Sequence, residues 1–220
     1  MFLKEISLEV YRFQGFFIVK KHSQKIRKST IYRLFHLQYM CTCMKNKYVP
    51  YAVADSIYEI DIDFFKKENV KILFADLDNT LDSYRLYHPT DRARKFAEDI
   101  QKEGITLVII SNNRGKRVRT YANDLGLIYL NSAAKPFGFR IRKFIKEHGW
   151  DPKDIMFVGD QMVTDVAAAK RAGLRVILTD KIVKEDQWTT HFNRIFGRRI
   201  RKYHKKRGNL INWRERYGKS

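Results

Sequence analysis

The chain has 220 residues, a formal net charge of +20 and 44% hydrophobic residues, which suits a globular protein with a sizeable core. Cys41 and Cys43 are the only cysteines, so neither a disulfide framework nor a complete cysteine zinc site is implied, and a reducing compartment fits. No apolar run approaches the ~20 residues that span a bilayer, and residues 16–19 are too few for a signal-peptide core. We therefore expect a cytoplasmic protein, either free or attached peripherally at the inner face of the membrane.

The chain begins with a basic segment that shows no sustained periodicity. Residues 1–46 carry nine Lys and Arg against two acidic residues. We assign residues 1–47 to a basic N-terminal extension and expect the main domain to follow it over residues 48–187.

Two carboxylates follow the first predicted strand of that domain. The apolar run 70–75 predicts a buried strand, and Asp76 and Asp78 come directly after it. Side chains two residues apart point the same way in a strand, so both carboxylates could converge beyond its carboxyl end, where α/β sheets bind ligands. Two close acids repel each other unless a cation or a shared proton relieves them, which favours Mg²⁺ bridging to phosphate. The alternative is an acidic turn in which Asn79 supplies the turn chemistry.

Two further predicted strands end in small polar or basic residues. The β-branched run 105–110 leads into Ser111 and Asn112, ahead of a predicted helix whose start can hold a phosphate oxygen. The run 127–130 is followed by Lys135, directly before a proline that is well placed to open a helix. An ammonium group there could neutralise phosphate. Taken alone, Ser111 would be an ordinary helix cap and Lys135 a surface lysine.

A second acidic pair follows the predicted strand 155–158. Asp160 comes two residues after this strand, and Asp165 lies near the start of the next predicted helix. Either residue alone could be a turn or helix-start acid. Because each polar group comes at the carboxyl end of an apolar run, the shared topology favours one catalytic site.

Strands and helices alternate through the central region. Glycines follow the predicted helices, as expected after helix ends. This order predicts an α/β domain with a five-stranded parallel sheet and helices on both faces. The predicted strands are 70–75, 105–110, 127–130, 155–158 and 174–178, and the predicted helices are 90–103, 114–125, 137–148 and 161–172.

Residues 188–220 predict a basic amphipathic helix followed by a tail. Residues 191–220 carry eleven Lys and Arg against one acidic residue. Such a helix can lie in a membrane interface, or its apolar stripe can pack on the main domain while the basic face is solvated. The stripe recurs at helical spacing and consists of Trp188, Phe192, Ile195, Phe196, Ile200 and Tyr203.

The four motifs, in this order, resemble the haloacid dehalogenase-like hydrolase superfamily, whose signatures are Asp-x-Asp-x-Thr, a Ser or Thr, a Lys, and Gly-Asp-x(4)-Asp. The resemblance covers about residues 71–179. Longer strings are similar to the YqeG family of subfamily IIIA, which is phosphatidylglycerophosphatase-like, and they extend the match to about residues 48–207. Met44 lies shortly before this match, which leads to the hypothesis that translation of the native protein starts there. The strings are DLDNTL at 76–81, SNN at 111–113, AKP at 134–136 and GDQ-x-x-TD at 159–165.

The resemblance implies a role for each site residue. Asp76 would be the nucleophile that forms an aspartyl-phosphate, and Asp78 would be the general acid and base. Asp78 would also contact the ion through its backbone carbonyl. The implied Mg²⁺ ligands are Asp76, Asp78, Asp160 and Asp165, and the implied phosphate-binding residues are Ser111, Asn112 and Lys135.

The spacing between motifs leaves no room for a separate cap domain. Asp78 and Ser111 are 33 residues apart, Ser111 and Lys135 are 24 apart, and one helix and one strand fill each interval. The segment 82–89 forms either a flap beside the site or a solvated loop. An open site suits a phosphate carried on something large.

The leading hypothesis is that the protein dephosphorylates phosphatidylglycerophosphate to phosphatidylglycerol, since the resemblance implies that substrate. The basic ends then favour an anionic phospholipid surface as the partner, with nucleic acid as the alternative. Two rival functions stay open. One is a phosphatase of soluble nucleotide or sugar phosphates, and the other is a nucleic-acid- or ribosome-binding protein with a vestigial site.

Overall fold

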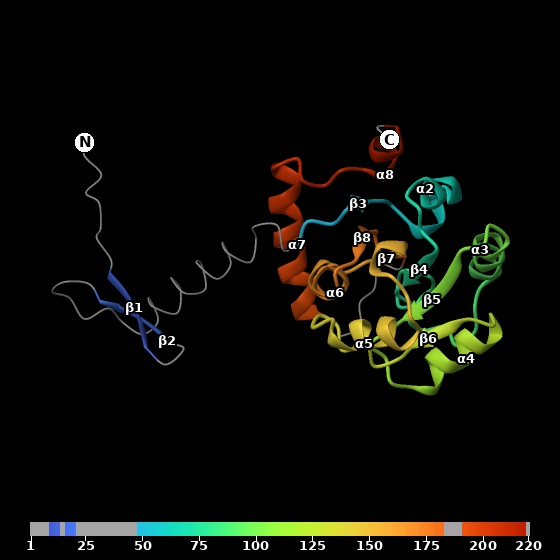
Figure 1. Ribbon diagram of the computed structural model, residues 1–220, viewed down its shortest axis with the longest axis horizontal. Helices are drawn as coiled ribbons and strands as arrows, with labels where there is room; N and C mark the ends of the chain where they lie inside the picture. Colours follow the sequence, from blue (N-terminus) through green and yellow to red (C-terminus); the bar gives the residue numbers. More distant parts are fainter. Residues whose placement is uncertain (1–8, 14–15, 21–47, 183–190, 219–220) are drawn as a thin grey trace. The chain divides into compact units, whose positions relative to one another are not determined.

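The computed structural model describes residues 9–13, 16–20, 48–182 and 191–218. The chain divides into two compact units, residues 1–45 and residues 46–220. In the first unit, strand β1 (Glu9–Phe13) pairs antiparallel with strand β2 (Phe16–Lys20) (Figure 1). Among the described residues, none of the helices has the length and apolar character needed to cross a membrane.

A parallel sheet of six strands forms the centre of the second unit, in the order β3-β8-β7-β4-β5-β6. All five predicted strands are present, and the structure adds β3 at one edge. Two residues are too few to show a period of two in the sequence. The strands are β3 (Ala52–Val53), β4 (Ile72–Ala75), β5 (Thr106–Ile110), β6 (Ile128–Leu130), β7 (Ile155–Gly159) and β8 (Arg175–Leu178).

Helices cover both faces of this sheet, as Figure 1 shows, with α2, α3 and α4 on one side and α5, α6 and α7 on the other. Successive residues of the central strand face opposite layers. Leu73 is in the large core cluster with α2 and α3, whereas the ring of Phe74 contacts Phe144 of α5. The helices are α2 (Ile62–Lys67), α3 (Asp91–Lys102), α4 (Lys116–Asp124), α5 (Phe139–Glu147), α6 (Ala167–Ala172), α7 (His191–Lys206) and α8 (Trp213–Tyr217).

Two helix starts differ from the prediction. Helix α5 begins at Phe139, so the expectation that Pro136 opens it is wrong. Gly138 precedes the helix with φ of 76°, and a Cβ there would lie 2.7 Å from the carbonyl oxygen of Ala168. The close approach of α6 therefore requires glycine and delays the helix. The helix predicted from residue 161 starts as a π-helical turn, η3 (Met162–Val166), and continues as α6.

The described part of α7 packs against the turn η3. Ile200 of the predicted apolar stripe is buried. At Gly197 an added Cβ would lie 3.6 Å from Val163, which places the backbone of α7 close to this turn. Four residues of the stripe fall outside the part whose side chains the structure describes, namely Trp188, Phe192, Ile195 and Phe196.

The C-terminal end of the chain also contacts the second unit. The Val53 amide donates a hydrogen bond of 2.9 Å to the Ile211 carbonyl oxygen, beside the edge strand β3. Trp213 is buried, and its ring lies edge-on to Phe64 with centroids 5.7 Å apart. These contacts belong to the same core that supports the central strand.

Candidate active site

Four of the sequence motifs meet at the carboxyl edge of the sheet. Asp76 follows the central strand β4, while Ser111 and Asp160 follow its two neighbours, β5 and β7. Lys135 lies in the loop after β6. Because all these strands are parallel, their carboxyl ends share one edge, and the connecting loops converge there.

Lys135 joins two carboxylates in the interior of this edge. Its Nζ lies 2.5 Å from Asp76 Oδ1 and 2.7 Å from Asp165 Oδ1, and it also donates to the Ile110 carbonyl oxygen at 3.1 Å. At most 6% of each of the three charged side chains is exposed. Water cannot stabilise these buried charges, so each charge depends on its ion-pair partners. The ammonium and the two carboxylates are therefore held in fixed positions.

Asn112 holds the backbone of Lys135 in place. Its side-chain oxygen accepts from the Lys135 amide at 2.7 Å, and its side-chain nitrogen donates to the Lys135 carbonyl oxygen at 2.9 Å. This reciprocal pair fixes the loop that carries the ammonium group. The structure thus gives Asn112 a positioning role, and its contact with phosphate stays a prediction.

Asp76, Asp160 and Asp165 form a candidate metal centre. Each offers a carboxylate oxygen, and these atoms all lie within 4.8 Å of one another. When all three carboxylates are ionised and Lys135 is charged, the cluster has two negative charges, which a divalent cation would neutralise. Carboxylate oxygens are the ligands that Mg²⁺ prefers, so this donor set fits the implied ion. The predicted contribution of Asp78 is through its backbone carbonyl, and its carboxylate is not in the cluster.

Local packing positions Asp165 for this role. The Gln161 amide donates to Asp165 Oδ2 at 2.9 Å. A Cβ at Gly159 would lie 2.6 Å from the Cβ of Asp165, closer than two such atoms can approach. Glycine at the end of β7 therefore lets the carboxylate lie against the strand.

Burial changes how the central charges titrate. The pKa of Asp76 is raised to about 7: desolvation is the largest cause, Lys135 acts against it, and the charges of Asp165 and Asp78 add to the rise. For Lys135, burial on its own lowers the pKa, but Asp165 and Asp76 outweigh it and the pKa lies above its ordinary value. Lys135 thus stays charged at neutral pH. A further cation beside Asp76 would stabilise the ionised form of its carboxylate.

Arg117 of helix α4 holds the carboxylate of Asp78. Its guanidinium binds Asp78 Oδ1 and also donates to the carbonyl oxygens of Leu86, at 2.5 Å, and Ser83, at 3.0 Å. The Arg117 side chain is 5% exposed and that of Asp78 is 24% exposed. Ser111 Oγ lies 3.5 Å from Asp78 Oδ2, on another side of this carboxylate. Arg117 therefore links the candidate general acid and base to the loop that follows it.

The sequence analysis missed Arg117, although the sequence contains a signal for it. Arg117 shares the buried face of α4 with Val118, Tyr121 and Ala122. Arginine on such a face almost always has a charged or polar partner. Searching the amphipathic pattern for an out-of-place charge would have found it.

The segment 82–89 is anchored at both ends. Asp82 is buried and accepts hydrogen bonds from the Thr90 amide at 3.0 Å and the Tyr121 hydroxyl at 2.6 Å. His88 Nδ1 lies 2.6 Å from Asp124 Oδ2. Within residues 48–182 the two intervals between motifs hold only α3 with β5 and α4 with β6 as regular elements, so the predicted absence of a cap domain is confirmed.

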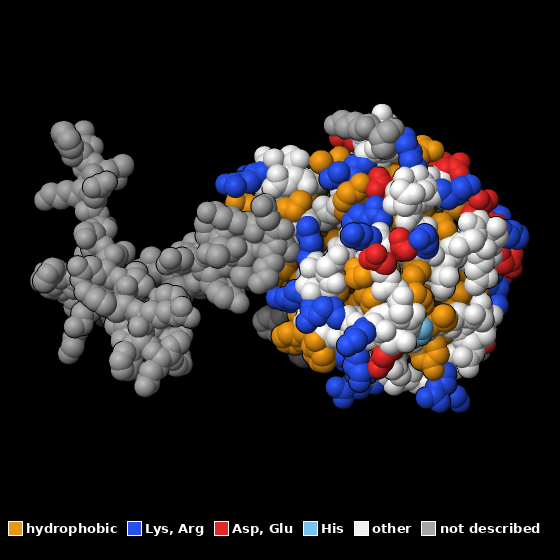
Figure 2. Space-filling model, in the orientation of Figure 1, with side chains coloured by type: hydrophobic (Ala, Val, Ile, Leu, Met, Phe, Trp, Pro, Cys, Tyr) orange, Lys and Arg blue, Asp and Glu red, His pale blue; other side chains and the backbone are white. Residues whose placement is uncertain are grey.

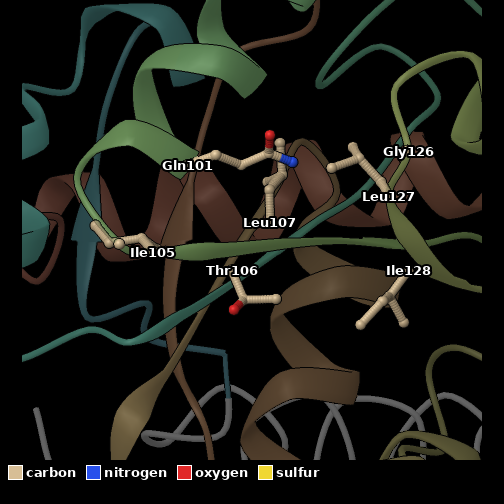
Figure 3. Close-up of a pocket in the computed structure, with 8 residues that line it drawn as sticks. Gln101, Ile105, Thr106, Leu107, Gly126, Leu127 and Ile128 are labelled. Carbon is tan, nitrogen blue, oxygen red and sulfur yellow. The ribbon is translucent and has the colours of Figure 1, made fainter.

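A hollow of about 270 Å³ lies elsewhere, beside the amino ends of β5 and β6 (Figure 3). The side chains that line it are mostly apolar and include Leu107, Leu127 and Ile128. It is at the opposite edge of the sheet from the acidic cluster. The candidate active site is therefore the polar edge and not this hollow.

Comparisons with known proteins agree with this arrangement. The family model for haloacid dehalogenase-like hydrolases matches residues 21–173. The chain is 32% identical over 172 residues to "Probable phosphatase YqeG" of Bacillus subtilis, covering 78% of this chain and 99% of that protein.

Solved structures show weaker similarity. The 3-deoxy-D-manno-octulosonate 8-phosphate phosphatase of Moraxella catarrhalis, in complex with magnesium ion, phosphate ion and KDO, is 17% identical with a TM-score of 0.43, over 61% of this chain and 88% of that one. The cobalt-bound phosphatase YrbI of Haemophilus influenzae is 16% identical with a TM-score of 0.44, over 53% and 81%. The family model and the YqeG match carry the assignment: this chain belongs to the haloacid dehalogenase-like hydrolase family.

Proposed function

We propose that the protein is a Mg²⁺-dependent phosphomonoesterase that works through an aspartyl-phosphate. The observation that supports this most directly is the buried Asp76–Lys135–Asp165 cluster, with Asp160 beside it, at the carboxyl end of the central strand. A nucleophilic carboxylate needs neighbouring positive charge to approach an anionic phosphate, and this cluster combines a fixed ammonium with a candidate cation site.

The residues divide the reaction into two steps. Asp76 attacks phosphorus, the ester P–O bond breaks, and Asp78 gives its proton to the leaving alkoxide. Asp78 then takes a proton from the water that attacks the phospho-aspartate, which frees phosphate and restores Asp76. Lys135 balances negative charge during both steps, and Ser111 is close enough to Asp78 to contact the transferred group. A Mg²⁺ ion held by Asp76, Asp160 and Asp165 would supply further charge neutralisation.

We propose phosphatidylglycerophosphate as the substrate. The resemblance to the YqeG family implies this lipid, and the absence of a cap over residues 48–182 leaves the phosphate site accessible to a head group that is still part of a membrane. A capless site also suits other bulky phosphate esters.

The test is Mg²⁺-dependent phosphate release from phosphatidylglycerophosphate in mixed micelles, with soluble sugar and nucleotide phosphates in parallel. Asp76→Asn removes the nucleophile, and Asp154→Asn, at the opposite edge of the sheet, is the matched control. We expect the protein to hydrolyse the lipid faster than the soluble esters. Hydrolysis should be lost in Asp76→Asn and kept in Asp154→Asn. Turnover of soluble esters alone would contradict the lipid substrate, and tight RNA binding without any hydrolysis would favour the nucleic-acid-binding alternative.

A further inference from the structure

Exposed hydrophobic side chains gather around the candidate active site. Among the residues whose side chains the structure describes, six large hydrophobic side chains are exposed. Ile128 is at the amino end of β6, in the hollow of Figure 3. The other five lie in segments that follow the carboxyl ends of β4, β6 and β8. We call these five the apolar rim: Leu86, Tyr87, Phe137, Phe139 and Ile182.

Hydrogen bonds connect these segments to the motif residues. The Leu86 carbonyl oxygen accepts from Arg117, whose guanidinium also binds Asp78. The Ile182 amide donates to the Asn79 carbonyl oxygen at 3.0 Å. Phe137 follows Lys135 by two residues and is 64% exposed. The apolar rim therefore comes from three segments of the chain, each connected to a motif residue by a hydrogen bond or by close sequence position.

Two of the three segments that carry the apolar rim, and the segment that follows β5, are basic, whereas the segment of Ile182 holds one acidic and one basic residue. Residues 83–88, 112–119 and 135–143 together contain nine Lys and Arg and no Asp or Glu. Arg117 and Lys135 are buried against the catalytic carboxylates, and the other seven basic residues are exposed. On the face seen in Figure 2, acidic side chains lie over α2 and α3 and near the centre, and basic and hydrophobic ones are interleaved over the part where α4 and α5 lie.

We propose that the apolar rim docks on the surface of an anionic lipid bilayer. Its aromatic side chains would enter the boundary between head groups and acyl chains, and the surrounding Lys and Arg would bind the anionic head groups. A protein seated on this rim would cover the entrance to the site, whereas a bilayer would bring its own phosphate head groups to that entrance. This proposal rests on the proposed function for its choice of a lipid-borne substrate.

The described part of α7 is a less suitable membrane contact than the rim. Ile200 of its apolar stripe is buried, and the backbone at Gly197 lies against the turn η3. The side chains that this part of α7 leaves exposed are basic, including Arg198, Arg199 and Lys202. They can strengthen attraction to an anionic surface, but they offer no apolar group for insertion.

The test measures binding alone, so that it is independent of hydrolysis. The full chain is mixed with vesicles of phosphatidylglycerol and phosphatidylcholine, which hold no phosphomonoester, and bound protein is measured by sedimentation. The rim variant, which combines Phe137→Ser and Phe139→Ser, should bind these vesicles at least tenfold more weakly than the wild type. Ile128→Ser removes an exposed hydrophobic side chain far from the rim and should bind as the wild type does. A melting temperature unchanged in both variants establishes that they fold.

A second measurement follows insertion directly. Phe137→Trp should add tryptophan fluorescence that brominated acyl chains quench. The fluorescence added by Ile128→Trp should not be quenched. Vesicle binding that is equal in the wild type and the rim variant would overturn the proposal, as would binding to RNA with none to vesicles. If the rim binds vesicles but phosphatidylglycerophosphate is not hydrolysed, the proposed function fails and the docking surface stands.

Discussion

Replacing Arg117 with methionine should impair both the stability and the activity of the protein. The substitution keeps a long apolar side chain on the buried face of α4 but removes every hydrogen bond of the guanidinium. The carbonyl oxygens of Leu86 and Ser83 lose their donor, and Asp78 loses its ion pair.

The structure sets the size of the effect. Removing one partner of a buried ion pair costs ~3–5 kcal/mol. The Asp78 side chain is 24% exposed, so water can partly replace Arg117, and we expect the free energy of unfolding to fall by ~2–3 kcal/mol. A displacement of Asp78 by ~1 Å would lower kcat by ~100-fold. Arg117→Lys keeps the charge but cannot reach all three acceptors at once, so its losses should be intermediate.

Urea unfolding and initial rates of Mg²⁺-dependent phosphomonoester hydrolysis measure these two effects. Arg119→Met is the matched control, because Arg119 is exposed on the same helix. A purely structural role would lower stability without changing kcat in the remaining folded protein. If Arg117→Met retained wild-type kcat and stability, the positioning role assigned to Arg117 would be refuted.

Three further predictions concern the cluster and the C-terminal segment. Gly159→Ala places a methyl group against Asp165, so Mg²⁺ affinity measured by calorimetry should fall at least tenfold, and unchanged affinity would contradict the packing argument. In EDTA, the urea stability of the wild type should fall as the pH rises from about 4 to about 7: folded Asp76, with a pKa of about 7, keeps a proton in that range that an unfolded aspartate has lost. Asp76→Asn should abolish that slope, and a slope that persisted would place its origin elsewhere. Trp213→Ala removes a buried ring packed on Phe64 and should cost ~3 kcal/mol in unfolding free energy; a loss below ~0.5 kcal/mol would mean that the C-terminal segment adds little to the core.

Local patterns in the sequence determine much of the main domain. The five predicted strands and the helices between them show as apolar runs and 3.6-residue periods because each element buries one face or two against its neighbours. The motif residues Asp76, Ser111 and Asp160 follow directly from that pattern, since parallel strands bring their carboxyl ends to one edge. The family assignment rests on the same motifs and agrees with the comparisons.

Contacts between distant residues were decided only by the tertiary structure. The pairing of Arg117 with Asp78 joins residues 39 apart, and Asn112 holds Lys135 across 23 residues. The edge strand β3 exists because β8 offers it a partner, and helix α5 starts late because Gly138 must pass close to α6. The pattern of α4 marks Arg117 as buried, but no local period or propensity identifies the partners in these contacts. Each depends on which surfaces meet after the chain folds, and that is physically why the sequence alone predicts the position of the site but not how its charged groups are held.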